Sequence, residues 1–215
     1  MLQAASKHKI KRFVFASSSS VYGDTDQFPQ VETQYPLLIS PYALSKLAGE
    51  YYCRIFSEHF NVTTACLRYF NVYGPKQALD DEYAVVVPKF IHCILHDEPP
   101  PIFGNGKQSR DFTYIDNVVS ANILAATTPG LKHEIFNVAN GKNQTVLELV
   151  DVLNKIIGKN VKPAHLPIRA GDIFKTHANI DNIKNKTNFK PLVNFEDGLK
   201  KTVKYFEQKF ASLKS

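Results

Sequence analysis

A helix with clear boundary signals lies between two short apolar runs near the start of this 215-residue sequence. Ser40 is a suitable N-cap and Pro41 suits the first helical position, so the pattern predicts a helix over 41–59. The apolar runs at 12–16 and 62–67 have the length and composition of buried parallel strands. A strand, a helix and a second strand in this order predict an α/β fold built on a parallel sheet.

Tyr42 and Lys46 lie four residues apart at the start of the predicted helix, so their side chains share one helix face. A lysine cation beside a phenol stabilises the phenolate, the form that a general base needs. Tyr205 and Lys209 have the same spacing, which by itself more often means a half-buried tyrosine with a solvated lysine. Tyr42 additionally follows a helix start and a strand that ends in serines. We therefore expect Tyr42, and not Tyr205, to transfer protons.

The bulk composition indicates a soluble globular protein. Hydrophobic residues make up 44% of the chain, which is enough for one domain with a small additional lobe. No apolar run approaches the 18 or so residues of a membrane span, and the first residues lack the apolar stretch of a secretory signal. We expect a cytoplasmic protein with no membrane partner.

The cysteines and histidines predict no metal site. Cys53, Cys66 and Cys93 are far apart and read as small buried hydrophobes. His92 and His96 are four residues apart on a predicted helix, but they lack the intervening glutamate of a His-Glu-x-x-His zinc motif.

The net charge of +6 and the sequence pI of about 9.1 raise the question of a nucleic-acid partner. The surplus lysines gather in the last third of the chain without interleaved aromatic residues, so a solvated helix face explains them better. A basic cleft would also suit an anionic small molecule. The sequence therefore favours a small-molecule partner over a nucleic acid.

Beyond residue 75 the alternation becomes shorter, as in a second lobe. The absence of any Gly-x-Gly-x-x-Gly or Gly-x-x-x-x-Gly-Lys loop means that no segment matches the usual pyrophosphate cradle, and the chain reads as the later part of a longer protein. Further predicted elements are a helix over 87–96, strands at 102–103 and 111–115, a helix capped by Asp116, a strand over 134–138, a helix from Thr145 to Gly158, and a last helix from about 194 to 210.

Five ordered motifs together resemble the extended short-chain dehydrogenase/reductases, specifically the NAD-dependent epimerase/dehydratase family. Among its branches the sequence is most similar to the nucleotide-sugar 4-epimerases that act on UDP-glucose or UDP-N-acetylglucosamine. The motifs are Phe-Ala-Ser-Ser-Ser-Ser-Val-Tyr-Gly-Asp at 15–24, Ser-Pro-Tyr-Ala-Leu-Ser-Lys at 40–46, Leu-Arg-Tyr-Phe-Asn-Val-Tyr-Gly-Pro at 67–75, Gln-Ser-Arg-Asp-Phe-Thr-Tyr-Ile-Asp at 108–116 and Arg-Ala-Gly-Asp at 169–172.

The resemblance implies a Rossmann-like parallel sheet with a small α/β substrate-binding lobe. The family's front end, roughly 100 residues with the first strands and the glycine-rich turn, has no counterpart here. Residues 1–75 would form the remainder of the NAD-binding domain, and residues 76–215 would form mostly the nucleotide-sugar lobe, with some strands returning to the main sheet. The full-length protein is expected to be a homodimer.

The resemblance also implies the roles of the catalytic residues. NAD would oxidise the sugar at C4 and then return the hydride to the opposite face, while Tyr42 exchanges the proton of the C4 hydroxyl and Lys46 stabilises its ionised form. Ser18 aligns with the serine that hydrogen-bonds the sugar, with Ser19 and Ser20 as alternatives. The residues expected to bind the cofactor are Ala16, Ser17, Tyr42, Lys46, Tyr69 and Phe70.

The substrate ligands implied by the resemblance are spread over the chain. Arg110 and Arg169 would bind the diphosphate, although each could instead form a surface ion pair. Phe103 would line the nucleoside pocket, although it could instead be a core residue. The whole expected set is Ser18, Ser19, Ser20, Asn71, Pro88, Phe103, Arg110, Asn137, Arg169, Asp172 and Thr176.

Two positions indicate which reaction and which sugar to expect. Related 4,6-dehydratases carry an Asp-Glu pair where this chain has serines, and UDP-glucuronate decarboxylases usually carry a glutamate there, so Ser18–Ser20 favour epimerisation. Thr176 is small where epimerases restricted to plain hexoses tend to have a bulky aromatic, which leaves room for an N-acetyl group. The alternatives are a related decarboxylase, dehydratase or glucuronate epimerase, or a non-catalytic fragment that binds a nucleotide sugar weakly.

Overall fold

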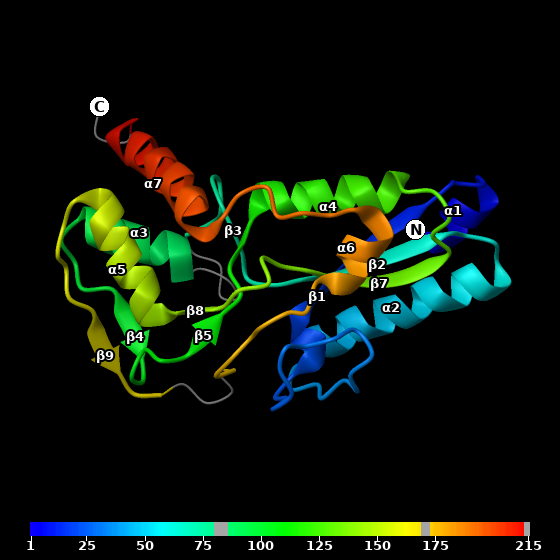
Figure 1. The fold of residues 1–215 in the computed structure, drawn as a ribbon, viewed down its shortest axis with the longest axis horizontal. Coiled ribbons are helices and arrows are strands. Elements are labelled where there is room, and N and C mark those ends of the chain that lie inside the picture. Colours follow the sequence, from blue (N-terminus) through cyan, green and yellow to red (C-terminus); the bar gives the residue numbers. More distant parts are fainter. Residues whose placement is uncertain (80–85, 169–172, 213–215) are drawn as a thin grey trace.

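The computed structural model describes residues 1–79, 86–168 and 173–212, and at its centre lies a three-stranded parallel sheet (Figure 1). The strands are β1 (Phe13–Ser18), β2 (Thr64–Tyr69) and β7 (His133–Val138), in the order β1-β2-β7. Helix α2 (Pro41–His59) covers one face of the sheet and α4 (Ile115–Thr127) covers the other. The predicted α/β class with a parallel sheet is confirmed.

Local signals explain where α2 begins and ends. The Ser40 hydroxyl accepts the N–H of Ala43 at 3.1 Å, and Pro41 occupies the first helical position. After His59 the chain leaves the helix through Asn61, whose φ is 53°. The predicted helix over 41–59 is therefore confirmed. Helix α1 (Leu2–Lys7) precedes β1.

The remaining elements form a smaller lobe and the segments that join it to the sheet. Helices α3, α5 and α7 pack against one another in the lobe (Figure 1). The bounds are a 3₁₀ helix η1 (Ser19–Tyr22), β3 (Val72–Tyr73), α3 (Val86–Leu95), β4 (Pro101–Phe103), β5 (Ser109–Arg110), β6 (Thr113–Tyr114), β8 (Gln144–Thr145), α5 (Val146–Ile157), β9 (Ala164–Leu166), α6 (Asp181–Thr187) and α7 (Phe195–Ser212). Strands β3 and β6, and likewise β4 and β9, pair in parallel, whereas β5 and β8 pair antiparallel.

Two apolar cores stabilise these two parts. One core surrounds the sheet and includes Leu67 and Phe136, while the other lies in the lobe and includes Phe90 and Leu153. Ile115, at the start of α4, packs against both cores. Burial of this kind contributes roughly 25 cal/mol per Å² of apolar surface, so both parts have their own source of stability.

Two predicted element boundaries were wrong. Asp116 does not cap α4, because the helix begins one residue earlier at Ile115 with Tyr114 at the N-cap. The predicted strand over 111–115 is reduced to Thr113–Tyr114, since the carboxylate of Asp111 binds backbone N–H groups of another segment. Among the helices of the described ranges, none is both long and apolar enough to cross a lipid bilayer.

Candidate functional site

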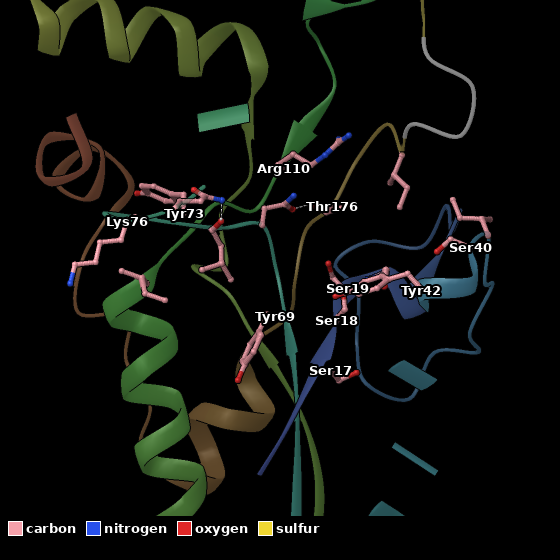
Figure 2. Close-up of a pocket in the computed structure, with 18 of the residues that line it drawn as sticks. Ser17, Ser18, Ser19, Ser40, Tyr42, Tyr69, Tyr73, Lys76, Arg110 and Thr176 are labelled. Carbon is pink, nitrogen blue, oxygen red and sulfur yellow. Dashed lines mark hydrogen bonds between the residues drawn. The ribbon is translucent and has the colours of Figure 1, made fainter. Parts of the chain in front are cut away.

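A cavity of about 890 Å³ opens at the carboxyl ends of β1 and β2, between the sheet and the lobe (Figure 2). Ligands of parallel α/β folds bind at this edge of the sheet. The cavity is lined by predicted site residues, namely Ser17–Ser20, Tyr42, Tyr69, Asn71, Arg110 and Thr176, and by residues not predicted for the site, namely Ile39, Ser40, Val72, Tyr73, Gly74, Pro75, Lys76, Gln77, Ile115 and Ile173.

Tyr42 and Lys46 lie as the helix spacing predicts. The Lys46 ammonium donates a hydrogen bond to the Ala16 carbonyl of β1 at 2.9 Å and lies 5.5 Å from the centre of the Tyr42 ring. The Tyr42 side chain is 45% exposed and extends toward Ser18 and Ser19 (Figure 2). The structure thus brings a phenol and serine hydroxyls to the cavity, with the Lys46 cation beside the ring of that phenol.

The serines differ in how their hydroxyls are used. Ser17 is buried and donates to Oε1 of Glu50. The Ser18 hydroxyl accepts the N–H of Ser20 at 3.1 Å and so caps η1, which leaves its own proton available to a ligand. The Ser20 hydroxyl is buried and has no hydrogen-bond partner among the described residues. The choice among Ser18, Ser19 and Ser20 as the sugar-binding serine remains open.

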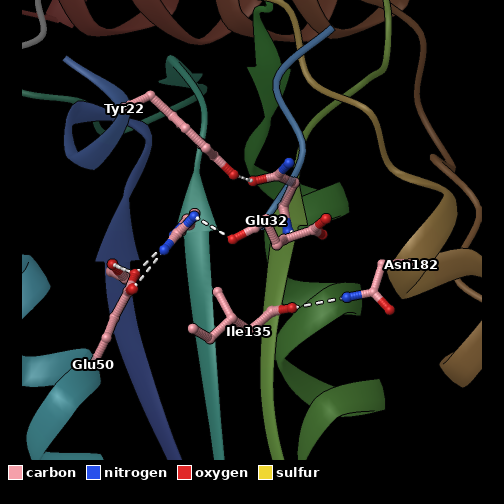
Figure 3. A network of polar contacts seen from close by, with 8 residues as sticks. Tyr22, Glu32, Glu50, Ile135 and Asn182 are labelled. Carbon is pink, nitrogen blue, oxygen red and sulfur yellow. Dashed lines mark hydrogen bonds and ion pairs between the residues drawn. The ribbon is translucent and has the colours of Figure 1, made fainter. Parts of the chain in front are cut away.

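A buried ion pair that sequence reasoning missed includes Glu50, the residue that accepts the hydrogen bond from Ser17 (Figure 3). Arg68 on β2 donates to both oxygens of Glu50 on α2, at 2.9 and 2.7 Å, and both side chains are 3% exposed. Because Glu50 also accepts from Ser17, it joins the helix to two strands. The available signal was that Glu50 follows Lys46 by four residues and therefore shares the helix face of Tyr42.

Asn137 was expected among the substrate ligands, and the structure places it in this buried network. Its carboxamide oxygen accepts from the Tyr22 hydroxyl at 2.6 Å, and its Nδ2 donates to the carbonyls of Gln30 and Asn179. Burial raises the pKa of Tyr22 to about 12, so this phenol stays protonated and continues to donate. Asn137 is fully buried and is not among the residues that line the cavity, and its predicted substrate role stays a prediction.

The residues that line the cavity also do not include Phe70, Pro88 or Phe103. Phe70 is fully buried in the core beside Tyr22, with ring centres 6.0 Å apart. Pro88 is buried in α3, and Phe103 ends β4 in the lobe. Their roles stay predictions. Arg169 and Asp172 lie outside the described residues.

Arg110 lies on the lobe side of the cavity. It is part of β5, and its Nη1 donates to the carbonyls of Ser109 and Phe174 at 3.0 and 3.2 Å. These bonds tie the guanidinium to two neighbouring segments, and Arg110 is one of the residues that line the cavity (Figure 2). The arrangement suits an anionic ligand, because a guanidinium has five N–H donors.

One cluster of metal-ligating residue types occurs in the described part of the chain. His92, Cys93 and Glu98 at the end of α3 have ligand atoms within 4.8 Å of one another. Burial raises the pKa of the Cys93 thiol, which disfavours the thiolate form that binds metals. The cluster does not line the cavity, and the predicted absence of a metal site stays a prediction.

The chain is similar to known proteins in both sequence and fold. The sequence model of the NAD dependent epimerase/dehydratase family matches residues 1–139. A UDP-N-acetylglucosamine 4-epimerase from Methanobrevibacter ruminantium, solved with UDP-N-acetylmuramic acid, is 39% identical with a TM-score of 0.92, over 96% of this chain and 66% of that one. A UDP-glucose 4-epimerase from Thermotoga maritima, solved with UDP-glucose, is 37% identical with a TM-score of 0.92, over 97% and 67%.

A UDP-glucuronic acid 4-epimerase from Bacillus cereus, solved with UDP-glucuronic acid and NAD, is 33% identical with a TM-score of 0.89, over 97% of this chain and 65% of that one. This chain therefore spans about two thirds of the length of these relatives. The predicted family is confirmed, and the similar proteins act on UDP-sugars that differ in the sugar.

Proposed function

Because the chain belongs to the NAD-dependent epimerase/dehydratase family, we propose that it is the catalytic and substrate-binding part of a UDP-sugar 4-epimerase. The observation that carries the proposal is the cavity, which Tyr42, the serines, Arg110 and Asn71 line together. Tyr42 and the serines can exchange protons with a sugar, and Arg110 and Asn71 can bind its diphosphate.

The residues of the sheet edge fit the nicotinamide end of NAD. Lys46 carries three N–H donors and uses one on Ala16, which leaves donors for ribose hydroxyls. Tyr69 lies at the end of β2 and lines the cavity, and its O–H donates to Oδ1 of Asn122 at 3.0 Å. When bound, NAD supplies reversible hydride transfer at C4 of the sugar.

Tyr42 removes the proton from the C4 hydroxyl as the carbon is oxidised to a ketone, and returns a proton when the ketone is reduced from the other face. Lys46 stabilises the phenolate between these two events, because a nearby cation favours the charged form of a phenol. Ser18 donates its hydroxyl proton to the C4 oxygen, and this bond strengthens as negative charge develops there. Ser19 and Ser20 remain alternatives for this role.

Arg110 and Asn71 bind the diphosphate, so that the sugar can turn within the cavity while the nucleotide stays fixed. A planar guanidinium binds two phosphate oxygens at once, and Arg110 already has its orientation set by two carbonyls. Arg169, also expected at the diphosphate, lies outside the described residues.

We favour epimerisation over dehydration or decarboxylation because Ser18–Ser20 offer hydroxyls where those reactions need an additional acid and base. We further propose that the protein accepts UDP-N-acetylglucosamine as well as, or better than, UDP-glucose. Thr176 lines the cavity and is small enough to leave space for an N-acetyl group. Turnover of UDP-glucose alone would contradict this substrate, and T176Y should suppress the acetylated substrate first.

The deciding experiment compares Y42F with Y205F, a matched substitution in the terminal helix. UDP-glucose or UDP-N-acetylglucosamine is incubated with the chain and NAD, and C4 epimers are separated by chromatography. We expect Y42F to lose epimerisation by at least about a thousandfold while calorimetry still detects UDP-sugar binding. Y205F should behave like the wild type. Binding without turnover in the wild type would support the alternative, a non-catalytic UDP-sugar binder.

We also propose that the partners are small molecules and not nucleic acids, in a cytoplasmic protein. Many surface lysines near the end of the chain already face carboxylates, including Lys186 with Glu134 and Lys201 with Asp116. Such pairs are typical of a solvated surface. Retention on immobilised DNA at moderate salt would contradict this proposal.

A further inference from the structure

Asn71 is held in an unusual backbone conformation at the cavity wall. It lies between β2 and β3 with a φ of 29°, a value that asparagine tolerates better than most residues. Its carbonyl accepts the N–H of Thr113 on β6 at 3.1 Å, which fixes the backbone but leaves the side chain to be oriented separately. The direction of the carboxamide therefore depends on what its two ends contact.

Thr176 supplies that contact from the opposite segment (Figure 2). Its side chain is only 5% exposed, and its backbone N–H is bonded to the Ser109 carbonyl at 3.0 Å. The Thr176 hydroxyl accepts the backbone N–H of Asp111 at 3.1 Å and lies 2.9 Å from Oδ1 of Asn71. The backbones of Asn71 and Thr176 are thus each held by hydrogen bonds that do not involve the contact between the hydroxyl and the carboxamide.

The chemistry of a hydroxyl group decides which end of the amide faces it. A hydroxyl has one proton to donate, and Oδ1 of Asn71 is its only acceptor within the described residues. If the carboxamide were reversed, that proton would have no acceptor and Oδ1 would point into the cavity. Satisfying the proton therefore turns Nδ2, with its two N–H donors, toward the cavity.

We propose that Thr176 is a positioning residue that aims the Asn71 Nδ2 donors at an acceptor oxygen of the ligand, such as a diphosphate oxygen. Arg110 lines the same cavity, so an amide donor and a guanidinium would bind one anionic group. The identity of the substrate rests on the proposed function, whereas the orientation of the amide does not. The small side chain at position 176 is then required for its hydroxyl as well as for its size.

The first test measures the chemical shifts of the Asn71 side-chain amide in the ligand-free protein by ¹⁵N–¹H NMR. The Asn71 side-chain signals are identified by their disappearance in N71D. T176V keeps the shape of threonine but has no hydroxyl, so it should shift the Asn71 signals, and T176S should restore them. T127V, which removes a hydroxyl bonded only within α4, should leave them unchanged. Asn71 signals that are identical in T176V and the wild type would overturn the proposal.

The second test uses epimerisation of UDP-glucose. T176V should raise KM roughly tenfold with kcat changed less than about twofold, the result expected for a lost hydrogen bond made equally in the ground and transition states. T176S should recover most of the loss, and N71D should bind worse than T176V because it offers an anion to the substrate. A T176S variant as impaired as T176V would overturn the proposal. No turnover in the wild type would refute the proposed function, and the NMR result would then decide the role of Thr176.

Discussion

The buried Glu50–Arg68 ion pair, which also binds Ser17, should contribute measurably to the stability of the fold around the serines. Removing one charge of a buried pair leaves the other without compensation, which costs about 3–5 kcal/mol. We therefore expect E50Q to lower the free energy of unfolding in urea by about 3 kcal/mol. The exposed pair Arg54 and Glu58 on the same helix is the control, and E58Q should change stability by less than about 0.5 kcal/mol. Equal losses of unfolding free energy in E50Q and E58Q would contradict a stabilising role of the buried pair.

His133 predicts a pH dependence of stability. Its Nδ1 lies 2.7 Å from the Thr64 hydroxyl, and burial, with help from the nearby Arg54 cation, lowers the pKa of His133 from its ordinary value of 6.5. The unfolded chain therefore takes up a proton at a pH where the folded chain does not, so the free energy of unfolding should decrease as pH falls below about 6.5.

Urea unfolding at a series of pH values between 7.5 and 5 checks this expectation. H133Q should weaken the decrease, whereas H59Q, at a side chain 68% exposed, should retain it. A decrease of the same size in H133Q and the wild type would show that other groups cause it.

Residues whose role depends on local spacing could be predicted from sequence, and residues whose role depends on distant partners could not. Tyr42 and Lys46 share one helix turn, and the structure places the Lys46 ammonium beside the Tyr42 ring, which lines the cavity. The pairing of Glu50 with Arg68 spans 18 positions and that of Thr176 with Asn71 spans 105, so no local pattern signals either one. Asn137 is held in the interior by Tyr22 and two backbone carbonyls, which lie 42 to 115 positions away in the sequence.

At the scale of elements, α2 approaches β1 so closely that only glycine fits at the contact. A Cβ at Gly49 would lie 2.2 Å from the ring of Phe15. Alanine would favour the helix by about 1 kcal/mol, but overpacking costs about 1–3 kcal/mol. We expect G49A to lower Tm by a few degrees and to impair catalysis, because the Lys46 ammonium lies 5.6 Å from the centre of the same ring.

The control for this substitution is a second change in Phe15. In an F15L background the ring is gone, so G49A should become neutral or slightly stabilising in thermal unfolding. An equal loss of Tm in both backgrounds would show that the contact with Phe15 is not the cause.

Helix α2 was predictable to the residue because its start signals are local, as is the capping box of Thr145 and Glu148 that begins α5. The second strand was predicted over 62–67 but runs from Thr64 to Tyr69, because Val62 bonds back to the end of α2 and because Glu50 allows a charged Arg68 to stay in the strand. The two-residue strands β3, β5 and β8 depend on pairing between distant segments, which periodicity does not reveal.

At the scale of the whole molecule, the outer face of α2 carries an exposed apolar stripe. The stripe consists of Leu44, Tyr51, Tyr52 and Ile55, which are 44–61% exposed and share the helix face opposite the sheet. We propose that this stripe forms a homodimer interface, as expected for the family. Contiguous apolar surface of this kind commonly marks a protein interface.

Analytical ultracentrifugation tests the dimer. We expect a dimer in the wild type and a monomer in a Y52E/I55K double variant, because two charges would be buried in the interface. I123K, at an exposed apolar residue of α4, should remain dimeric. A monomeric wild type at about 100 µM would contradict the proposed interface.

The division into a sheet part and a lobe could be anticipated from the change in element length, and two separate apolar cores are consistent with it. The exact boundary could not be anticipated, because α4, β7 and α6 pack on or join the sheet although they follow the first elements of the lobe in the sequence. Such returns depend on which apolar faces meet in three dimensions. The predicted division at residue 75 therefore stays a prediction.

Cys53 on α2 and Cys66 on β2 are both fully buried between the helix and the sheet, and contact with Cys53, together with burial, raises the pKa of Cys66. A thiol reagent can reach them only when the helix detaches from the strand. Their labelling rate therefore measures how often α2, which carries the Tyr42 phenol, separates from the sheet, which carries the serines. A ligand that contacts both the phenol and the serines should lower this rate.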